Sequence, residues 1–191
     1  MKALAINGSS RKNGNTAYLL QRCLDQLANN GIEGELVQLA GKTIKPCTAC
    51  RTCYEKMNKK CTQEEDAFHE VFEKMQAADI IVVGSPTYFG SATSQMMALL
   101  QRAGYVSRAN GNLFSRKLGG PVAVARRAGE NFTYAQLMYF FMVNDMVVPG
   151  STYWNVSVAK APGDAEKDTE AIETIDRFAA NLAWLADKLN R

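Results

Sequence analysis

The chain has 191 residues, of which 47% are hydrophobic and 21% are charged. This length suits one domain, and the apolar fraction suffices for a buried core. Because 22 basic residues oppose only 19 acidic ones, the net charge of +3 does not predict nucleic-acid binding. The composition therefore indicates a single globular domain over residues 1–191.

The N-terminal segment carries no secretory or membrane-spanning signal. The apolar run Ala3–Ile6 is followed at once by Asn7 and Gly8. A signal peptide needs a longer apolar region, and a spanning helix needs roughly 20 apolar residues. No such run occurs elsewhere, so we expect a cytoplasmic protein that does not bind a membrane. Because cytosolic thiols stay reduced, the five cysteines are not expected to form a disulfide framework.

Strand and helix patterns alternate along the chain. Strands are predicted at Lys2–Asn7, Glu35–Leu39, Asp79–Gly84, Pro121–Ala125 and Met146–Val148. Helices are predicted around Leu19–Leu27, Phe68–Met75, Met96–Ala103, Phe132–Val143 and Ile172–Leu189, with a loop at Lys160–Asp168. This alternation predicts an α/β fold, a doubly wound five-stranded parallel sheet with helices on both faces. Ligands of such sheets bind beyond the carboxyl ends of the strands.

The segment after the first strand is rich in hydrogen-bond donors. It reads Asn7-Gly-Ser-Ser-Arg-Lys-Asn-Gly-Asn-Thr16 and opens directly into a helix. Its N–H groups and hydroxyls can therefore surround an anion at the positive end of the helix dipole. The P-loop pattern and the dinucleotide fingerprint are both absent, which disfavours a nucleoside triphosphate and a pyrophosphate. A terminal phosphomonoester fits best, and the alternative is a polar turn that caps the helix.

Two further loops have unusual chemistry for segments that follow strands. Ser85-Pro-Thr-Tyr-Phe-Gly-Ser91 follows the most apolar strand, and its rings and backbone amides suit a flat aromatic ligand, unless the rings fold back onto the core. The loop Arg126–Asn131 has two adjacent arginines, which indicate either an anion contact or a solvated edge. A phosphate site and a flat-ring site on one five-stranded sheet together point to flavin mononucleotide (FMN).

Four cysteines are clustered in one segment. Cys47, Cys50, Cys53 and Cys61 form the pattern C-x2-C-x2-C-x7-C, and four thiolates are the ligand set of a [4Fe–4S] cluster. Zinc is a weaker candidate, because structural zinc sites usually combine two separated knuckles. The alternative is a set of free or exchangeable thiols. The excursion, residues 40–61, is longer than a connection requires, which usually signals function.

The chain resembles the flavodoxin-like NAD(P)H-dependent FMN reductase family, and within it the iron-sulfur flavoprotein branch. The resemblance is carried by Gly8–Thr16, by Ser85–Gly90 and by the cysteine segment, and it covers nearly the whole chain. It implies a flavodoxin-like fold with FMN as the cofactor. It also implies a [4Fe–4S] cluster wherever the four cysteines hold iron rather than remain free.

The resemblance further implies which residues bind FMN. The phosphate would lie on Ser9, Arg11, Asn15 and Thr16, and the isoalloxazine ring against residues 86–90. The third loop departs from the family's glycine-rich form, so its arginines would meet either the far edge of the flavin or the phosphate of NADPH. The expected cofactor-binding residues are Ser9, Ser10, Arg11, Asn13, Asn15, Thr16, Ala17, Pro86, Thr87, Tyr88, Phe89, Gly90, Arg126, Ala128 and Gly129.

The expected function is that of an FMN-dependent oxidoreductase. A hydride would pass from NAD(P)H to N5 of the flavin, and electrons would go on to a small acceptor such as a quinone, a free flavin or a metal ion. Since the cofactor carries this chemistry, no side chain is expected to be catalytic. One alternative is an iron-sulfur electron carrier that ferredoxin reduces in place of NAD(P)H, and another is a non-catalytic FMN-binding or thiol-based sensor. The resemblance also places the excursion near a subunit contact, so a homodimer or homotetramer is expected.

Overall fold

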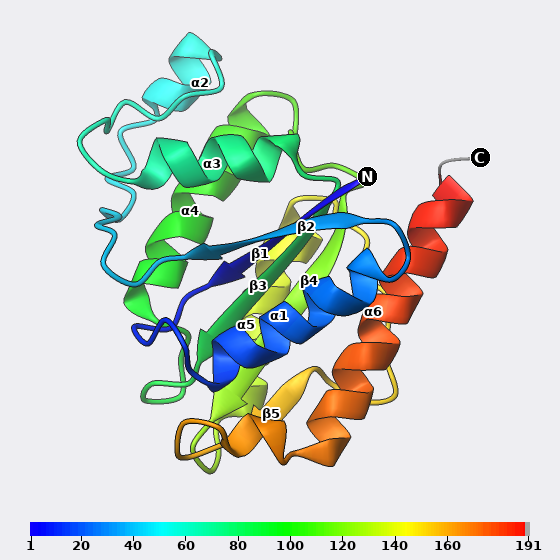
Figure 1. Ribbon diagram of the computed structural model, residues 1–191. Helices are drawn as coiled ribbons and strands as arrows, with labels where there is room; N and C mark the ends of the chain where they lie inside the picture. Colours follow the sequence, from blue (N-terminus) through cyan, green and yellow to red (C-terminus); the bar gives the residue numbers. More distant parts are fainter. Residues whose placement is uncertain (190–191) are drawn as a thin grey trace.

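The computed structural model describes residues 1–189 as a parallel sheet between two layers of helices (Figure 1). The strands are β1 (Lys2–Asn7), β2 (Glu33–Gln38), β3 (Ile80–Pro86), β4 (Leu118–Ala125) and β5 (Val156–Val158). The helices are α1 (Asn15–Ala28), α2 (Thr52–Lys56), α3 (Phe68–Ala77), α4 (Ser94–Ala109), α5 (Glu130–Val143) and α6 (Thr169–Leu189), with a 3-10 helix η1 (Asp164–Glu166). The strand order is β2-β1-β3-β4-β5, and all neighbouring strands are parallel, which confirms the predicted doubly wound sheet.

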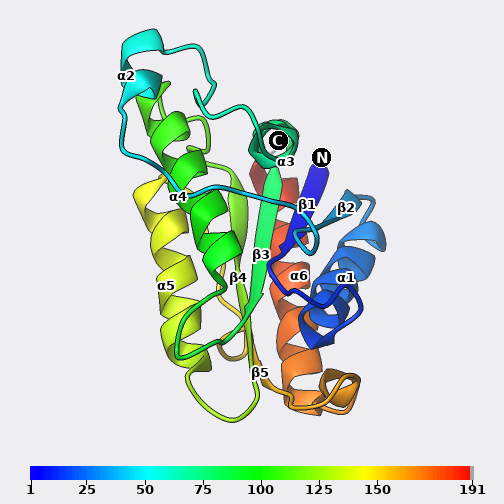
Figure 2. The ribbon, with the colours of Figure 1, turned by 90° about the vertical axis from the view of Figure 1, so that its left-hand side faces the viewer.

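Two apolar cores lie on the two faces of this sheet. Side chains alternate along β1, so that Leu4 and Ile6 join the core beneath α3, α4 and α5, whereas Ala3 and Ala5 join the core beneath α1 and α6. Figure 2 shows these two groups of helices on opposite sides of the sheet. Strand β3 is covered on both faces, which is why its run Ile80–Val83 is apolar throughout.

The prediction of the fifth strand at Met146–Val148 is wrong. This segment makes only an isolated bridge, in which Val147 exchanges hydrogen bonds with the backbone at the start of β4. The next N–H on that edge of β4 would belong to Pro121, which has none, so the ladder breaks there. The chain leaves the sheet and returns to the same edge only at β5 (Val156–Val158).

Other element boundaries differ from the prediction by a few residues. Strand β2 begins at Glu33 rather than Glu35, and the predicted loop Lys160–Asp168 contains η1. The sequence pattern does not predict α2, because a helix of five residues is too short to show a period. Among residues 1–189, no helix combines the length and the apolar character needed to cross a membrane.

Helix α4 separates the cysteine segment from the loops that follow the strands. It begins next to the loop that follows β3, at the carboxyl edge of the sheet. Both views place α2 and its flanking loops beside the far end of α4, where Tyr54 contacts Tyr105 with ring centroids 6.5 Å apart (Figures 1 and 2). The cysteine excursion and the three strand-end loops are therefore two separate regions of the chain.

Candidate functional site

The loop after β1 is held in shape by its own hydrogen bonds. The Asn7 side chain accepts from Ser9 N–H at 3.0 Å, and the Ser9 hydroxyl accepts from Arg11 N–H at 3.1 Å. Asn7 also donates to Gln38 of β2 at 2.6 Å. Helix α1 begins at Asn15, and no side chain caps its first turn. A shaped loop before an uncapped helix start is an arrangement that suits an anion.

The predicted phosphate-binding residues are not equally available for a ligand. Ser10, Arg11 and Asn13 are exposed, whereas Thr16 is buried in the first turn of α1. The Asn15 side chain is already committed to the loop after β5. It donates to the Ala161 carbonyl at 2.8 Å and accepts from the N–H groups of residues 163 and 165 at 3.1 and 3.3 Å.

The loop after β3 forms a tight turn with its aromatic side chains outside. Tyr88 and Ser91 exchange two backbone hydrogen bonds, at 2.8 and 3.1 Å. The two residues between them, Phe89 and Gly90, both have positive φ, of 52° and 74°. Phe89 is fully exposed and Tyr88 is about half exposed, so the rings do not fold back onto the core. A strained, exposed aromatic turn at the end of a central strand is consistent with a contact to a flat ligand.

The three strand-end loops meet at the carboxyl edge of the sheet. The Ser10 hydroxyl of the first loop lies 3.3 Å from the Tyr88 hydroxyl of the second. A Cβ added to Gly129 of the third loop would lie 3.2 Å from the Thr87 methyl group and 3.5 Å from the Gly90 Cα. The hydroxyl oxygen of Thr87 is buried and has no hydrogen-bond partner. An unmet polar atom and a close approach kept open by glycine both fit a bound group with polar ring atoms.

Thr93 connects the first two loops, although it lies outside the motifs that predict the site. Its hydroxyl donates to the Gly8 carbonyl at 2.8 Å and accepts from Met96 N–H at 3.3 Å, which caps α4. Its own N–H donates to the Ser85 hydroxyl at 3.0 Å. A threonine directly before a helical period is an N-cap signal, so the cap could have been predicted, but its contact with Gly8 could not.

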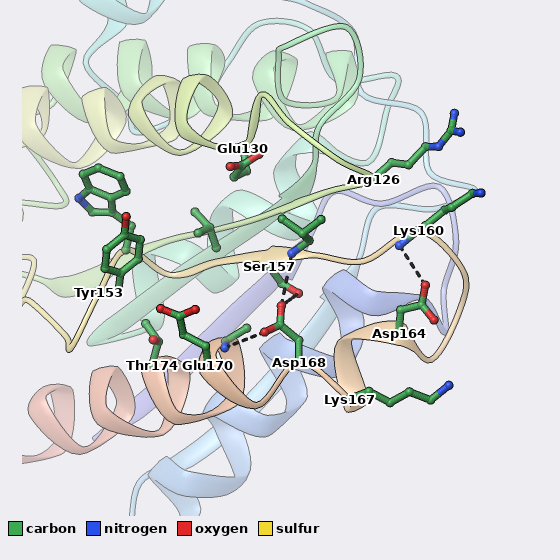
Figure 3. Close-up of a pocket in the computed structure, with 14 residues that line it drawn as sticks. Arg126, Glu130, Tyr153, Ser157, Lys160, Asp164, Lys167, Asp168, Glu170 and Thr174 are labelled. Carbon is green, nitrogen blue, oxygen red and sulfur yellow. Dashed lines mark hydrogen bonds between the residues drawn. The ribbon is translucent and has the colours of Figure 1, made fainter.

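The third loop divides its residues between two places. Gly129 lies against the loop that follows β3, whereas Arg126 lines a cavity of about 700 Å³ that runs along β5 between the starts of α5 and α6. Arg126 and Lys160 extend from one end of this cavity, and Tyr153 lies at the other (Figure 3). Asp168 accepts hydrogen bonds from the Ser157 hydroxyl and from the backbone of β5, so it shields the free edge of that strand.

The four clustered cysteines line a common cavity. They border it from the excursion, and Arg102, Tyr105 and Val106 of α4 border it from the domain body. All five cysteines are free thiols, and Cys23 is buried on α1. Within residues 1–189, no three His, Cys, Asp or Glu side chains are arranged so that they could jointly hold a metal ion. The four thiols therefore share a cavity without having converged on one point.

The environments of two of these thiols differ. Hydrogen bonds from Thr52 lower the pKa of the exposed Cys50 thiol. Burial raises the pKa of Cys53, and the nearby Cys50 and Cys61 contribute to this increase. An all-sulfur donor set of this kind fits an iron–sulfur cluster better than a hard cation.

The backbone of the excursion is bent around the cavity. Four of its non-glycine residues have positive φ, namely Ala49, Arg51, Met57 and Lys59. Such a conformation costs an L-residue about 1–2 kcal/mol, so it persists only where the surroundings require it. Helix α2 lies between two of these residues, which lets the short cysteine spacings turn toward one cavity.

The strand order and the two helix layers define a flavodoxin-like architecture. The chain belongs to the NADPH-dependent FMN reductase family, whose model matches residues 1–161. This membership makes it part of a family of FMN-binding oxidoreductases and confirms the resemblance that its motifs indicated.

Relatives over the full length are named iron-sulfur flavoproteins. One from Methanocaldococcus jannaschii is 36% identical over 190 residues, covering 96% of both chains. One from Archaeoglobus fulgidus is 32% identical, covering 98% of this chain and 96% of the relative. One from Methanosarcina thermophila is 30% identical, covering 100% of this chain and 98% of the relative.

Solved structures support the fold. RosB, crystallised with 8-demethyl-8-formylriboflavin-5'-phosphate, superimposes with a TM-score of 0.81 at 20% identity, covering 100% of this chain and 80% of RosB. A flavodoxin from the domain Archaea superimposes with a TM-score of 0.64 at 14% identity, covering 100% of both chains. The fold is thus flavodoxin-like.

Proposed function

We propose that this protein is an FMN-dependent oxidoreductase that passes electrons from NAD(P)H to a small acceptor such as a quinone, a flavin or a metal ion. The observation that carries the proposal is the junction of Ser10 with Tyr88, where the anion-binding loop meets the aromatic loop. A phosphorylated ring cofactor requires such adjoining sites. When bound, FMN supplies the hydride and electron transfer, so no side chain is proposed as catalytic.

The residues of the first loop hold the phosphate in this proposal. Backbone N–H groups at the start of α1 face the anion, and the helix dipole favours its charge. Asn15 acts indirectly, because its side chain holds the loop after β5 against the phosphate loop. The residues proposed to form the phosphate site, with Asn15 acting through this contact, are Ser9, Ser10, Arg11, Asn13, Asn15, Thr16 and Ala17.

The second and third loops hold the ring. The unpartnered Thr87 hydroxyl supports this role, because a ring oxygen or nitrogen would meet its hydrogen-bonding need. Tyr88 and Phe89 would cover the ring from solvent, and Gly129 lets the third loop approach it. The proposed ring-binding residues are Pro86, Thr87, Tyr88, Phe89, Gly90, Ala128 and Gly129, while Arg126 is proposed to meet the phosphate of NADPH.

A spectroscopic titration tests the flavin and its donor separately. Protein purified without oxygen is expected to bind FMN, and its flavin absorbance is expected to bleach on addition of NAD(P)H. Arg11→Gln should weaken FMN binding by about tenfold, the loss of one charge-assisted contact. Arg177→Gln on the exposed face of α6 is the matched control and should leave FMN binding unchanged. A colourless protein that refuses added FMN would refute the flavin site, and a bound flavin that NAD(P)H does not bleach would refute the donor.

The cysteine site favours a second candidate, an iron-sulfur electron carrier that ferredoxin reduces in place of NAD(P)H. Cys47, Cys50, Cys53 and Cys61 would hold a [4Fe–4S] cluster, which supplies one-electron transfer when bound. Exposed basic side chains surround the site and would attract an acidic protein partner, namely Lys45, Arg51, Lys56, Lys59 and Lys60. Faster reduction by ferredoxin than by NAD(P)H, with iron and sulfide present, would select this candidate.

A second copy of the chain is the proposed partner of the outer face of α4 and α5. This face exposes Tyr105, Tyr139, Met142 and Val143, and it borders an apolar cavity that also includes Tyr54 of α2. Thr93 adjoins the proposed flavin loops and Arg102 borders the cysteine cavity, and at 1.5 Å per residue along α4 they are about 14 Å apart. The cysteine site is therefore not adjacent to the flavin loops of its own chain. Light scattering should show a dimer or tetramer, and a strict monomer would refute the assembly.

A further inference from the structure

A buried guanidinium lies beside the cysteine cavity. Arg102 of α4 is only 1% exposed, and it lines the cavity together with the four cysteines. Removing a charge from water is costly unless other groups compensate it. Its contacts therefore indicate what the charge does at this position.

Arg102 holds both ends of the cysteine segment. Its Nη1 donates to the Lys45 carbonyl at 3.2 Å, and its Nη2 donates to the Gln63 carbonyl at 2.7 Å. Lys45 precedes the first clustered cysteine and Gln63 follows the last. One rigid side chain thus closes the loop on which the four thiols are carried.

The charge of Arg102 is balanced on one side only. The Asp66 carboxylate accepts a hydrogen bond from Arg102 Nη1. It also accepts from Lys45 N–H at 2.7 Å and from Phe68 N–H at 3.1 Å. Both side chains of the Arg102–Asp66 pair are 0% exposed. Asp66 does not line the cavity, whereas Arg102 does, so the cavity borders the cationic member of the pair. The Phe68 ring supports the guanidinium, whose carbon lies 4.0 Å from the ring centroid.

One donor of Arg102 is left without a partner. Its Nε–H is buried and makes no hydrogen bond. Buried donors are nearly always satisfied, so an unmet donor on a side chain that borders the cysteine cavity points to a hydrogen-bond acceptor that is present when the site is loaded. Hydrogen bonds to the sulfurs and nearby positive charge favour the reduced, more negative form of an iron–sulfur cluster.

We propose that Arg102 is the positioning and charge-compensating residue of the cysteine site. It closes the segment through Lys45 and Gln63, and it offers a cationic N–H donor to the sulfur ligands. The charge-compensating part rests on the proposed [4Fe–4S] cluster, whereas the closure of the segment does not require iron.

The test compares two substitutions that a purely structural role would treat alike. The midpoint potential of the cluster is measured by electron paramagnetic resonance during a redox titration of iron-loaded protein. Arg102→Gln removes the cation and should lower the potential, whereas Asp66→Asn leaves the cation uncompensated and should raise it. Arg102→Lys keeps the charge and should stay closer to the wild-type potential than Arg102→Gln. Shifts of Arg102→Gln and Asp66→Asn in the same direction, or no shifts, would overturn the charge-compensating role.

Hydrogen exchange on the iron-free chain tests the closure independently. Arg102→Gln and Arg102→Lys should both speed amide exchange in residues 46–62 by about tenfold, with no change in α1, because both lose the bridge between the two carbonyls. Arg177→Gln is the control and should change neither region. Unchanged exchange in the excursion would overturn the closure. If the wild-type chain takes up no iron, the charge-compensating role falls with the cluster, and the exchange result still decides the closure.

Discussion

Replacement of Thr93 by valine should test how the proposed phosphate loop, the segment between β1 and α1, is coupled to α4. Valine keeps the shape of threonine but has no hydroxyl, so the substitution removes the cap on Met96 N–H and the hydrogen bond to the Gly8 carbonyl. The lost cap costs about 1 kcal/mol. A buried carbonyl that loses its donor costs about 1–3 kcal/mol. The free energy of unfolding is therefore expected to fall by about 2–4 kcal/mol.

Urea denaturation of the flavin-free chain measures this effect, with Thr93→Ser as the matched control. Serine keeps both hydrogen bonds and loses one buried methyl group, so its cost should be about 1 kcal/mol. Because Gly8 begins the phosphate loop, Thr93→Val should also weaken FMN binding by about tenfold or more, whereas Thr93→Ser should not. Equal unfolding free energies and equal FMN affinities for the two variants would refute the coupling.

Three further substitutions address the aromatic turn, the phosphate loop and the buried ion pair. Phe89→Gly should stabilise the flavin-free chain by about 1 kcal/mol, because glycine adopts a positive φ without strain, and it should weaken FMN binding. Urea unfolding measures the first effect and FMN titration the second, and a loss of stability would contradict this reasoning. Asn15→Ala should lower the free energy of unfolding by about 2 kcal/mol through three lost hydrogen bonds, and an unchanged urea midpoint would show that they contribute nothing. Burial by itself would raise the pKa of Asp66, but hydrogen bonds from Lys45 and Arg102 outweigh it and hold that pKa below its ordinary value. The stability that this carboxylate contributes is therefore complete above about pH 4 and lost as the pH falls through the folded pKa, so the stability difference from Asp66→Asn should shrink in acid; a difference that widens would be inconsistent with this sign.

Local patterns were sufficient to predict the family, and the same patterns supply the residues proposed for the two sites. The donor-rich loop before α1, the aromatic turn after β3 and the four spaced cysteines are each read from consecutive residues, and their chemistry does not depend on the rest of the chain. The family match confirms the family resemblance that these motifs carried, whereas the roles of their individual residues stay predictions. The two-sided burial of β3 was likewise visible as an unbroken apolar run.

The contacts that join these motifs required the tertiary structure. Thr93 meets Gly8 across 85 positions, Asn15 meets Ala161 across 146, and Arg102 meets Lys45 across 57. The position of the fifth strand is decided in the same way. The N–H whose absence breaks the ladder belongs to Pro121 of β4 and not to the segment Met146–Val148. Hydrophobic period and turn chemistry act between near neighbours, whereas hydrogen bonds that close a sheet edge or a loop depend on which distant segments the fold brings together.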